Sequence, residues 1–144
     1  MQHKDELPKE VSDASESACA DAAIIVRNFL SAMEARDLET ARSLLSKSFS
    51  MQFPGTEPMT ELQQLLDWAK PRYGKISKSF EGFDTIAKNE RSATVYCYGR
   101  LSGTWPDGTS FDNIRFIDRF DIQDGKIIRQ DVWNDIAEIK AQNE

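Results

Sequence analysis

The stretch NIRFIDRFDIQDGKIIRQDVW, residues 113–133, decides the fold, because it has the pattern of two strands joined by a tight turn. In its first half, apolar residues fall two apart, as they do on one face of a strand: Ile114, Phe116, Phe120 and Ile122. Asp118 occupies the one gap in that apolar face, and Asp124-Gly125 is a preferred hairpin dipeptide. An unpaired buried charge is very costly, so Asp118 must either meet hydrogen-bond donors or keep its proton.

Strand-like segments also precede this stretch. Residues 76–87 and 93–104 are rich in β-branched and aromatic residues, and polar turns or a Pro-Asp-Gly turn bound them. Together with residues 109–122 and 126–133, they predict a four-stranded antiparallel meander in the second half of the chain.

Helical spacing of apolar residues marks the first half of the chain. We expect a first helix from Asp13, a second after Asp37 and a third from about Thr60. Residues 49–53 alternate as a short strand, and residues 135–142 indicate a short terminal helical turn. This order predicts an α+β fold, in which three N-terminal helices cover the central apolar pocket of a cone-shaped, curved antiparallel sheet.

At 144 residues the chain is expected to form one domain, residues 13–144, after a polar, disordered tail at residues 1–12. The net charge of −6 argues against a nucleic-acid partner and against binding to anionic membranes. The N-terminus has no apolar core of a secretory signal, and no apolar run is long enough to span a membrane. We therefore expect a cytoplasmic protein.

Neither a metal nor an organic cofactor is expected. The two cysteines, Cys19 and Cys97, lie too far apart for a metal motif, and each has the setting of a small buried hydrophobe. The only histidine, His3, lies in the predicted tail, which removes mechanisms that need a positioned imidazole.

Three pieces of the chain, taken in order, resemble the nuclear transport factor 2-like superfamily, which includes the SnoaL-like polyketide cyclases and the ketosteroid isomerases. The pieces are FLSAMEARDLETARSLLSKSF, MQFPGTEPM and FIDRFDIQDGKIIRQDVWND. The matching order covers most of residues 13–140. The resemblance implies a cone-shaped α+β fold, a deep apolar pocket and a homodimer packed through the sheet.

The resemblance does not bring the ketosteroid isomerase mechanism with it. Where those enzymes place a tyrosine on the first helix and an aspartate before a proline, this chain has Phe29 and Phe53. Phenylalanine can neither accept a proton nor donate to an oxyanion. The second acid of the isomerase oxyanion hole corresponds to Asp118, and a pocket tryptophan corresponds to Trp133.

Asp118 and Asp131 are the candidate catalytic residues. By resemblance to the SnoaL-like cyclases, either could be the acid/base in a hydrophobic pocket, where burial would raise its pKa. The alternative for Asp118 is a buried pair with Arg115, Arg119 or Arg129, and the alternative for Asp131 is a salt bridge at the strand edge.

The predicted ligand pocket is lined by apolar and aromatic side chains. A tyrosine such as Tyr98 could orient a carbonyl group through its hydroxyl, or it could pack in a dimer interface. The full predicted set is Phe29, Met33, Phe53, Trp68, Tyr73, Tyr98, Phe116 and Trp133.

Taken together, these features predict that the chain binds a small, mostly apolar molecule and performs proton-transfer chemistry of the lyase, isomerase or cyclase type. The alternative is a module that binds a ligand without catalysis, or one that works through dimerisation and partner binding.

Overall fold

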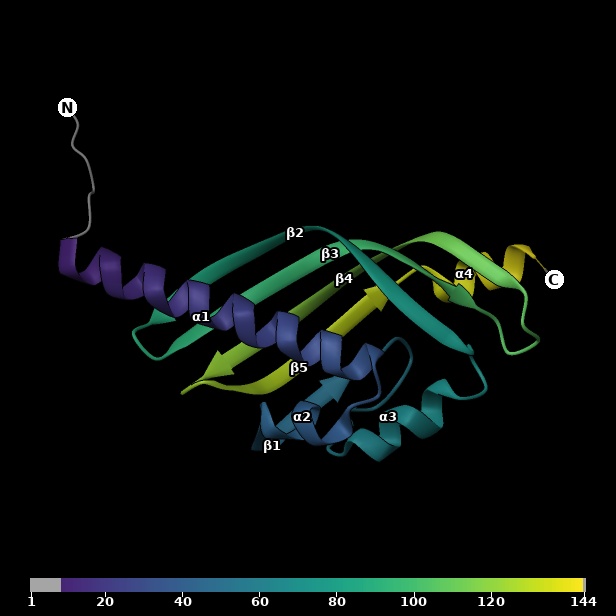
Figure 1. Cartoon of the computed structure of the whole chain (residues 1–144), viewed down its shortest axis with the longest axis horizontal. Helices are drawn as coiled ribbons and strands as arrows, with labels where there is room; N and C mark the ends of the chain where they lie inside the picture. The colour runs from purple at the N-terminus through teal and green to yellow at the C-terminus, as the bar shows by residue number, and fades with distance from the viewer. Residues whose placement is uncertain (1–8, 144) are drawn as a thin grey trace.

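The computed structural model describes the backbone of residues 9–143 and the side chains of residues 17–143. A curved sheet forms the body of the molecule, and α1 crosses one of its faces (Figure 1). The helices are α1 (Lys9–Glu34), α2 (Leu38–Ser43), α3 (Leu62–Ala69) and α4 (Ile136–Gln142). The strands are β1 (Leu45–Gln52), β2 (Lys75–Asn89), β3 (Ser92–Thr104), β4 (Ser110–Gln123) and β5 (Lys126–Asn134).

The sheet has the strand order β1-β5-β4-β3-β2. Strands β2 to β5 pair in an antiparallel meander, which confirms the prediction for the second half of the chain. The short strand expected at residues 49–53 is longer than predicted and pairs in parallel with β5, so the sheet is mixed rather than purely antiparallel. The α+β fold class is confirmed.

The first helix begins earlier than the sequence pattern indicated. Because α1 starts at Lys9, the expected start at Asp13 was wrong. Residues 9–12 contain no glycine or proline, so nothing in this segment opposes continuation of the helix toward the N-terminus. The rest of the predicted tail, residues 1–8, lies outside the described residues.

The hairpin between β4 and β5 fixes the register of the two strands that carry the candidate acids. Asp124 and Gly125 have φ values of 51° and 78°, the positive values that a tight two-residue turn requires. The pairing shifts between Asp121 and Ile122, which is a β-bulge. A bulge changes which side chains of a strand reach each face of the sheet.

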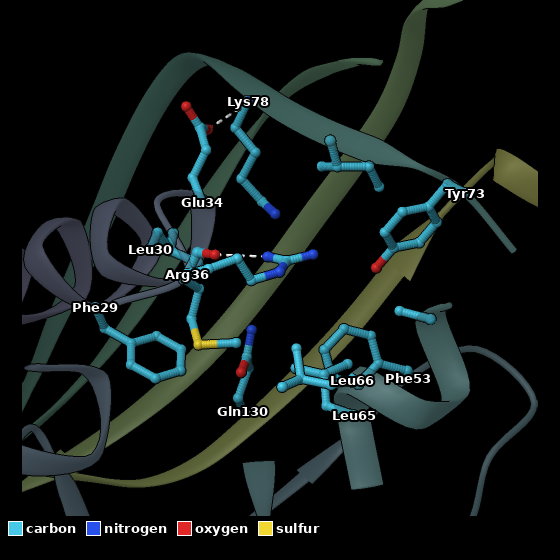
Figure 2. A pocket seen from close by; sticks show the side chains of 13 residues that line it. Phe29, Leu30, Glu34, Arg36, Phe53, Leu65, Leu66, Tyr73, Lys78 and Gln130 are labelled. Carbon is cyan, nitrogen blue, oxygen red and sulfur yellow. Dashed lines mark hydrogen bonds between the residues drawn. The ribbon is translucent and has the colours of Figure 1, made fainter. Parts of the chain in front are cut away.

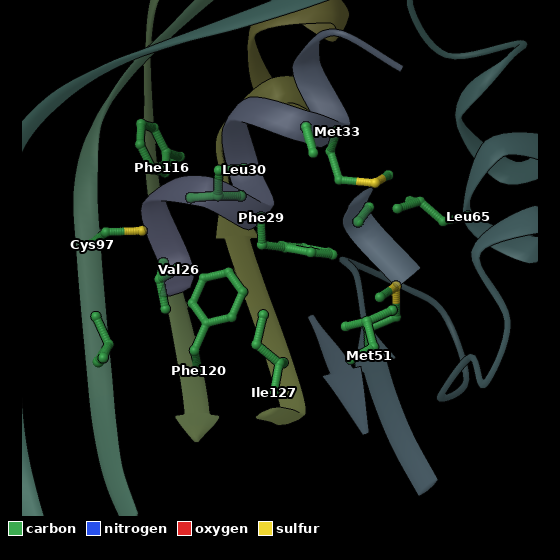
Figure 3. Packing of buried hydrophobic residues seen from close by; sticks show 14 of the residues in the cluster. Val26, Phe29, Leu30, Met33, Met51, Leu65, Cys97, Phe116, Phe120 and Ile127 are labelled. Atoms are coloured by element: carbon green, nitrogen blue, oxygen red, sulfur yellow. The ribbon is translucent and has the colours of Figure 1, made fainter. Parts of the chain in front are cut away.

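The core lies between α1 and the inner face of the sheet (Figure 3). Phe29 of α1 meets Phe120 of β4 edge to face, with ring centroids 6.1 Å apart. Val26 and Val95 are fully buried in the same cluster. None of the helices between residues 9 and 143 combines the length and apolar character that crossing a membrane requires.

Candidate functional site

A small cavity lies between the C-terminal end of α1, helix α3 and the first residues of β2 (Figure 2). Its volume is about 80 Å³, room for two or three water molecules, whereas ligand pockets commonly measure several hundred Å³. Its lining residues are Phe29, Leu30, Met33, Glu34, Arg36, Phe53, Leu65, Leu66, Ala69, Tyr73, Ile76, Lys78 and Gln130. Because Glu34 and Arg36 are exposed, the cavity opens to solvent at the end of α1.

Polar side chains face this cavity from separate parts of the fold. Figure 2 shows Lys78 Nζ and the guanidinium of Arg36 directed into the same space, with the Tyr73 hydroxyl opposite and Gln130 below. Burial raises the pKa of Tyr73, so its hydroxyl keeps its proton and can donate a hydrogen bond. Glu34 is engaged with the strand, because its Oε1 accepts a hydrogen bond from the backbone N–H of Lys78 at 3.3 Å.

Asp118 is buried on the inner face of β4, among the apolar residues that alternate with it. It is 1% exposed, and neither of its carboxyl oxygens accepts a hydrogen bond from the described residues. Burial raises the pKa of Asp118 to about 6, while the charge of Lys78 and the amide of Gln130 act in the opposite direction. A carboxyl group with this pKa changes its protonation state close to neutral pH.

Lys78 connects this acid to the cavity. Asp118 does not itself line the cavity, but Lys78 does, and its Nζ lies 4.0 Å from Asp118 Oδ2. The same Nζ lies 5.2 Å from the ring centroid of Phe116, a favourable distance for a cation over an aromatic face. Gln130, the other group acting on Asp118, also lines the cavity.

The arginines considered as partners of Asp118 all pair elsewhere. Arg115 pairs with Asp135, Arg119 with Asp121 and Asp131, and Arg129 with Asp131. The alternative in which one of them neutralises Asp118 was therefore wrong. From Ile114 to Gln123 the odd-numbered residues of β4 face away from the core, so an arginine next to Asp118 in sequence lies on the opposite side of the sheet.

Asp131 lies on the outer face of the sheet, away from the cavity. Its Oδ2 is 2.9 Å from Nε of Arg129 and 3.8 Å from Nη1 of Arg119. This arrangement corresponds to the salt-bridge alternative and gives Asp131 no access to a ligand in the cavity. Asp118 is therefore the candidate acid that the structure associates with the cavity.

The predicted pocket residues divide into three groups: four that line the cavity, two that lie behind it and two on the outer face of the sheet. Four of them line the cavity: Phe29, Met33, Phe53 and Tyr73. Trp68 and Phe116 lie just behind it, Trp68 with its ring centroid 5.2 Å from that of Phe53, and Phe116 beneath Lys78.

Tyr98 and Trp133 lie on the outer face, so the structure does not place them in the pocket. Both pair in register with Ile117, which puts the three side chains in one row across β3, β4 and β5. The Tyr98 hydroxyl donates to Asp84 Oδ2 at 3.1 Å, and Trp133 is 52% exposed. The assignment of Trp133 assumed a regular last strand, and the β-bulge reverses which face it occupies.

Sequence reasoning missed the cationic and amide groups of the cavity. Lys78 falls two residues after Ile76 and two before Phe80, so a lysine interrupts an apolar alternation much as Asp118 does in β4. That interruption was a usable signal. Arg36 and Gln130 carry no comparable signal, because a helix end and a bulged strand set their directions.

Within the described part of the chain, no group of three or more His, Cys, Asp or Glu side chains is arranged to hold a metal ion.

Comparison with known proteins identifies the family. The family model of the SnoaL-like domain matches residues 26–130. No curated protein matches the chain. A nuclear transport factor 2-like protein of unknown function from Burkholderia pseudomallei is 16% identical, with a TM-score of 0.71 over 84% of this chain and 95% of that one.

Two further solved structures have the same fold. TerC, co-crystallised with polyporic acid, is 15% identical, with a TM-score of 0.69 over 84% of this chain and 96% of its own. A proposed SnoaL-like polyketide cyclase from Jannaschia sp. CCS1 is 15% identical, with a TM-score of 0.64 over 96% of both chains. At these identities the likeness shows the fold alone, and the family model carries the assignment. The chain has the nuclear transport factor 2-like fold and belongs to the SnoaL-like domain family.

Proposed function

We propose that this protein binds a small, mostly apolar molecule with a carbonyl group in the cavity at the end of α1, and that it moves a proton on that molecule. The observation that carries the proposal is the state of Asp118. This acid is buried without a hydrogen-bond partner in the described part of the chain, 4.0 Å from a lysine that lines the cavity. The reaction is of the lyase, isomerase or cyclase type and uses neither a metal nor an organic cofactor.

The physical argument begins with the cost of burying Asp118. A buried polar group left without a partner destabilises a fold by about 1–3 kcal/mol, and an apolar residue at this position would avoid that cost. Acids with strongly shifted pKa values concentrate at functional sites. With a pKa of about 6, Asp118 can both accept and release a proton near neutral pH, which is the condition for general acid–base catalysis.

The reaction step follows from the pair of Asp118 and Lys78. Lys78 turns from Asp118 to the ligand's carbonyl oxygen, which uncovers the carboxylate and removes the positive charge that stabilised it. The carboxylate then takes a proton from the carbon next to the carbonyl, and the C–H electron pair moves to oxygen to form an enolate. The ammonium group stabilises the enolate oxygen. Asp118 finally returns the proton to the ligand.

The comparisons support this type of chemistry without assigning a substrate. One structural neighbour was co-crystallised with polyporic acid, and another is described as a proposed polyketide cyclase. The apolar residues at the two positions where ketosteroid isomerases hold polar groups, Phe29 and Phe53, argue against their mechanism.

A second candidate function is binding without catalysis, in a protein that acts as a homodimer. The volume of about 80 Å³ favours it, because a ring-sized ligand must also occupy the mouth or displace half-buried side chains such as Phe53 and Tyr73. On the outer face, Ile117 and Trp133 are 38% and 52% exposed, an apolar surface suited to a second copy of the sheet.

The dimer is tested by the Ile117→Glu variant in analytical ultracentrifugation. A sheet-to-sheet dimer should dissociate when a charge enters its apolar row, whereas Gln63→Glu, at an exposed position of α3, should leave the mass unchanged. A dimer that survives Ile117→Glu would place the contact elsewhere.

Catalysis is tested with the bicyclic ketone 2-tetralone in D₂O, where deuterium replaces the protons next to the carbonyl through an enolate. The protein should accelerate this exchange, measured by ¹H NMR, and Asp118→Asn should remove the acceleration while retaining binding. Exchange that is equally fast with Asp118→Asn would exclude Asp118 from the reaction. No acceleration by the wild-type protein would leave the second candidate function.

A further inference from the structure

The cavity is rich in hydrogen-bond donors and holds two positive charges. Arg36 and Lys78 direct cationic groups into it, and the Tyr73 hydroxyl faces them (Figure 2). The one carboxylate in the lining, Glu34, accepts a bond from the β2 backbone. A ligand that satisfies such a lining presents oxygen acceptors, and the two cations favour an acceptor that carries negative charge.

Arg36 occupies a position that normally belongs to glycine. The α1 helix ends with the backbone N–H of Arg36 bonded to the carbonyl of Met33 and that of Asp37 bonded to the carbonyl of Ala32, at 3.1 and 2.8 Å. These two bonds define the Schellman motif, in which the residue at the Arg36 position adopts a positive φ and is usually glycine. Arg36 has a φ of 61°, so helix termination alone does not account for an arginine here.

The arginine side chain is held at the cavity mouth. Its Nη1 donates to the carbonyl oxygen of Met33 at 2.6 Å, which uses one of five N–H donors. Among the residues the structure describes, Arg36 forms no ion pair with a carboxylate. The guanidinium is thus fixed in place with donors still available.

The surrounding charge reinforces this arrangement. The protein carries a net charge of −6, yet both Arg36 and Arg72 lie close enough to Tyr73 to oppose the rise that burial causes in its pKa. Arg72 lies over the ring of Trp68, with its guanidinium carbon 4.3 Å from the ring centroid. A positive entrance on an acidic protein draws anions toward the cavity and repels cations.

We propose that the molecule bound in this cavity carries a carboxylate group on its apolar body, and that Arg36 is the residue that selects for it. This inference rests on the proposed function, because it assigns the ligand class of the same cavity. Lys78 then serves the reacting carbonyl group, and Arg36 with Tyr73 holds the carboxylate at the mouth.

The test uses three probes of nearly equal shape and different charge: benzoate, benzamide and benzamidine. Binding is followed by ¹⁵N-resolved NMR titration of the full chain. We expect benzoate to bind about tenfold more tightly than benzamide, as one charge-assisted hydrogen bond allows, and benzamidine to bind most weakly. Arg36→Gln should abolish the preference for benzoate, and Arg42→Gln, at an exposed arginine of α2 outside the cavity, should retain it.

The Arg36→Gly variant separates selectivity from folding. Glycine suits the positive φ, so the melting temperature should stay unchanged or rise while the preference for benzoate is lost. A marked fall in melting temperature would give Arg36 a structural role and overturn the inference. Equal binding of benzoate and benzamide, or binding of none of the three probes, would also overturn it. None of these outcomes decides the proposed function. That function is tested separately with 2-tetralone, a ketone that carries no carboxylate.

Discussion

Asp118 and Asp131 are two buried carboxylates on neighbouring strands, and they differ in the partners that surround them. They are 1% and 8% exposed and lie one register step apart, since Asp118 pairs with Val132 and Arg119 pairs with Asp131. Among the side chains that the structure describes, Asp131 has two arginines within 4.0 Å, whereas Asp118 has one lysine at 4.0 Å and no hydrogen bond. Burial alone therefore does not mark a functional acid; burial without compensation does.

The strongest way to break this comparison is to remove each acid in turn and measure catalysis. We expect Asp118→Asn to slow protein-catalysed deuterium exchange into 2-tetralone by roughly 100-fold or more, which is the usual contribution of a general base to the rate. Asp131→Asn should change the rate by less than about twofold, because its side chain lies across the sheet from the cavity. Equal losses in the two variants would mean that the exchange reports on folding and not on a specific acid.

The next largest effect is a pH-dependent difference in stability. The pKa of Asp118 is raised from 3.8 to about 6, so between these values the unfolded chain loses this proton first, and wild-type stability falls as the pH rises. The Asp118→Asn variant does not titrate at this position. Its free energy of unfolding relative to wild type should therefore improve by on the order of 3 kcal/mol from about pH 3.5 to about pH 7.5.

Urea denaturation at a series of pH values provides this measurement, and Asp112→Asn, at an exposed position of β4, is the matched control. A difference between Asp118→Asn and wild type that stays constant with pH would show that Asp118 has an ordinary pKa in the folded state.

Asp131→Asn should lower the free energy of unfolding, which is the opposite direction to the effect of Asp118→Asn near neutral pH, and the change should be smaller. Removing this carboxylate leaves Arg129 and Arg119 with one partner fewer, but Arg129 is half exposed and Arg119 keeps Asp121 at 3.0 Å. We expect a loss of about 1 kcal/mol in the free energy of unfolding, and less at high salt, because ions screen partly exposed pairs. A gain in stability would place Asp131 with Asp118 among the uncompensated acids and remove the contrast between them.

The sequence pattern was enough to place Asp118 on the inner face of its strand but not to place Asp131 on the outer face, for a reason that lies in the backbone. Strand β4 alternates regularly along its second half, so the period of two placed Asp118 on the inner face. Strand β5 contains a bulge between Ile127 and Arg129, which shifts its alternation by one residue and sends Asp131 and Trp133 outward. No local residue pattern identifies a bulge when both possible faces contain polar and apolar side chains.

The cavity itself was even less accessible to sequence reasoning. The cone-shaped fold implied an apolar pocket, and Phe29, Met33, Phe53 and Tyr73 do line a cavity. Its polar groups depend on features without a sequence signature, such as a helix that ends with an arginine where glycine is usual. The volume of the cavity depends on side-chain packing, which periodicity does not describe.

The smallest expected effect concerns Lys78, the cation 4.0 Å from Asp118. Lys78→Met keeps the length and the packing of the side chain but removes the charge, so the pKa of Asp118 should rise further above its value in the wild type. The rise should be modest, because the charged group lies 4.0 Å away on a side chain that is 21% exposed, where solvent screens it. A ¹³C NMR titration of the carboxyl carbon measures the change.

Lys75→Met on the same strand is the matched control, since Lys75 is exposed and does not line the cavity. If Lys78→Met leaves the pKa of Asp118 unchanged, the two groups are not coupled, and the proposed movement of Lys78 could not make Asp118 a stronger base. If the pKa of Asp118 rises in Lys78→Met and not in Lys75→Met, Lys78 partly stabilises the charged form of Asp118, as the two arginines stabilise that of Asp131. A single cation that can turn toward a ligand leaves its acid available for reaction, whereas two arginines on one carboxylate hold it in the structure.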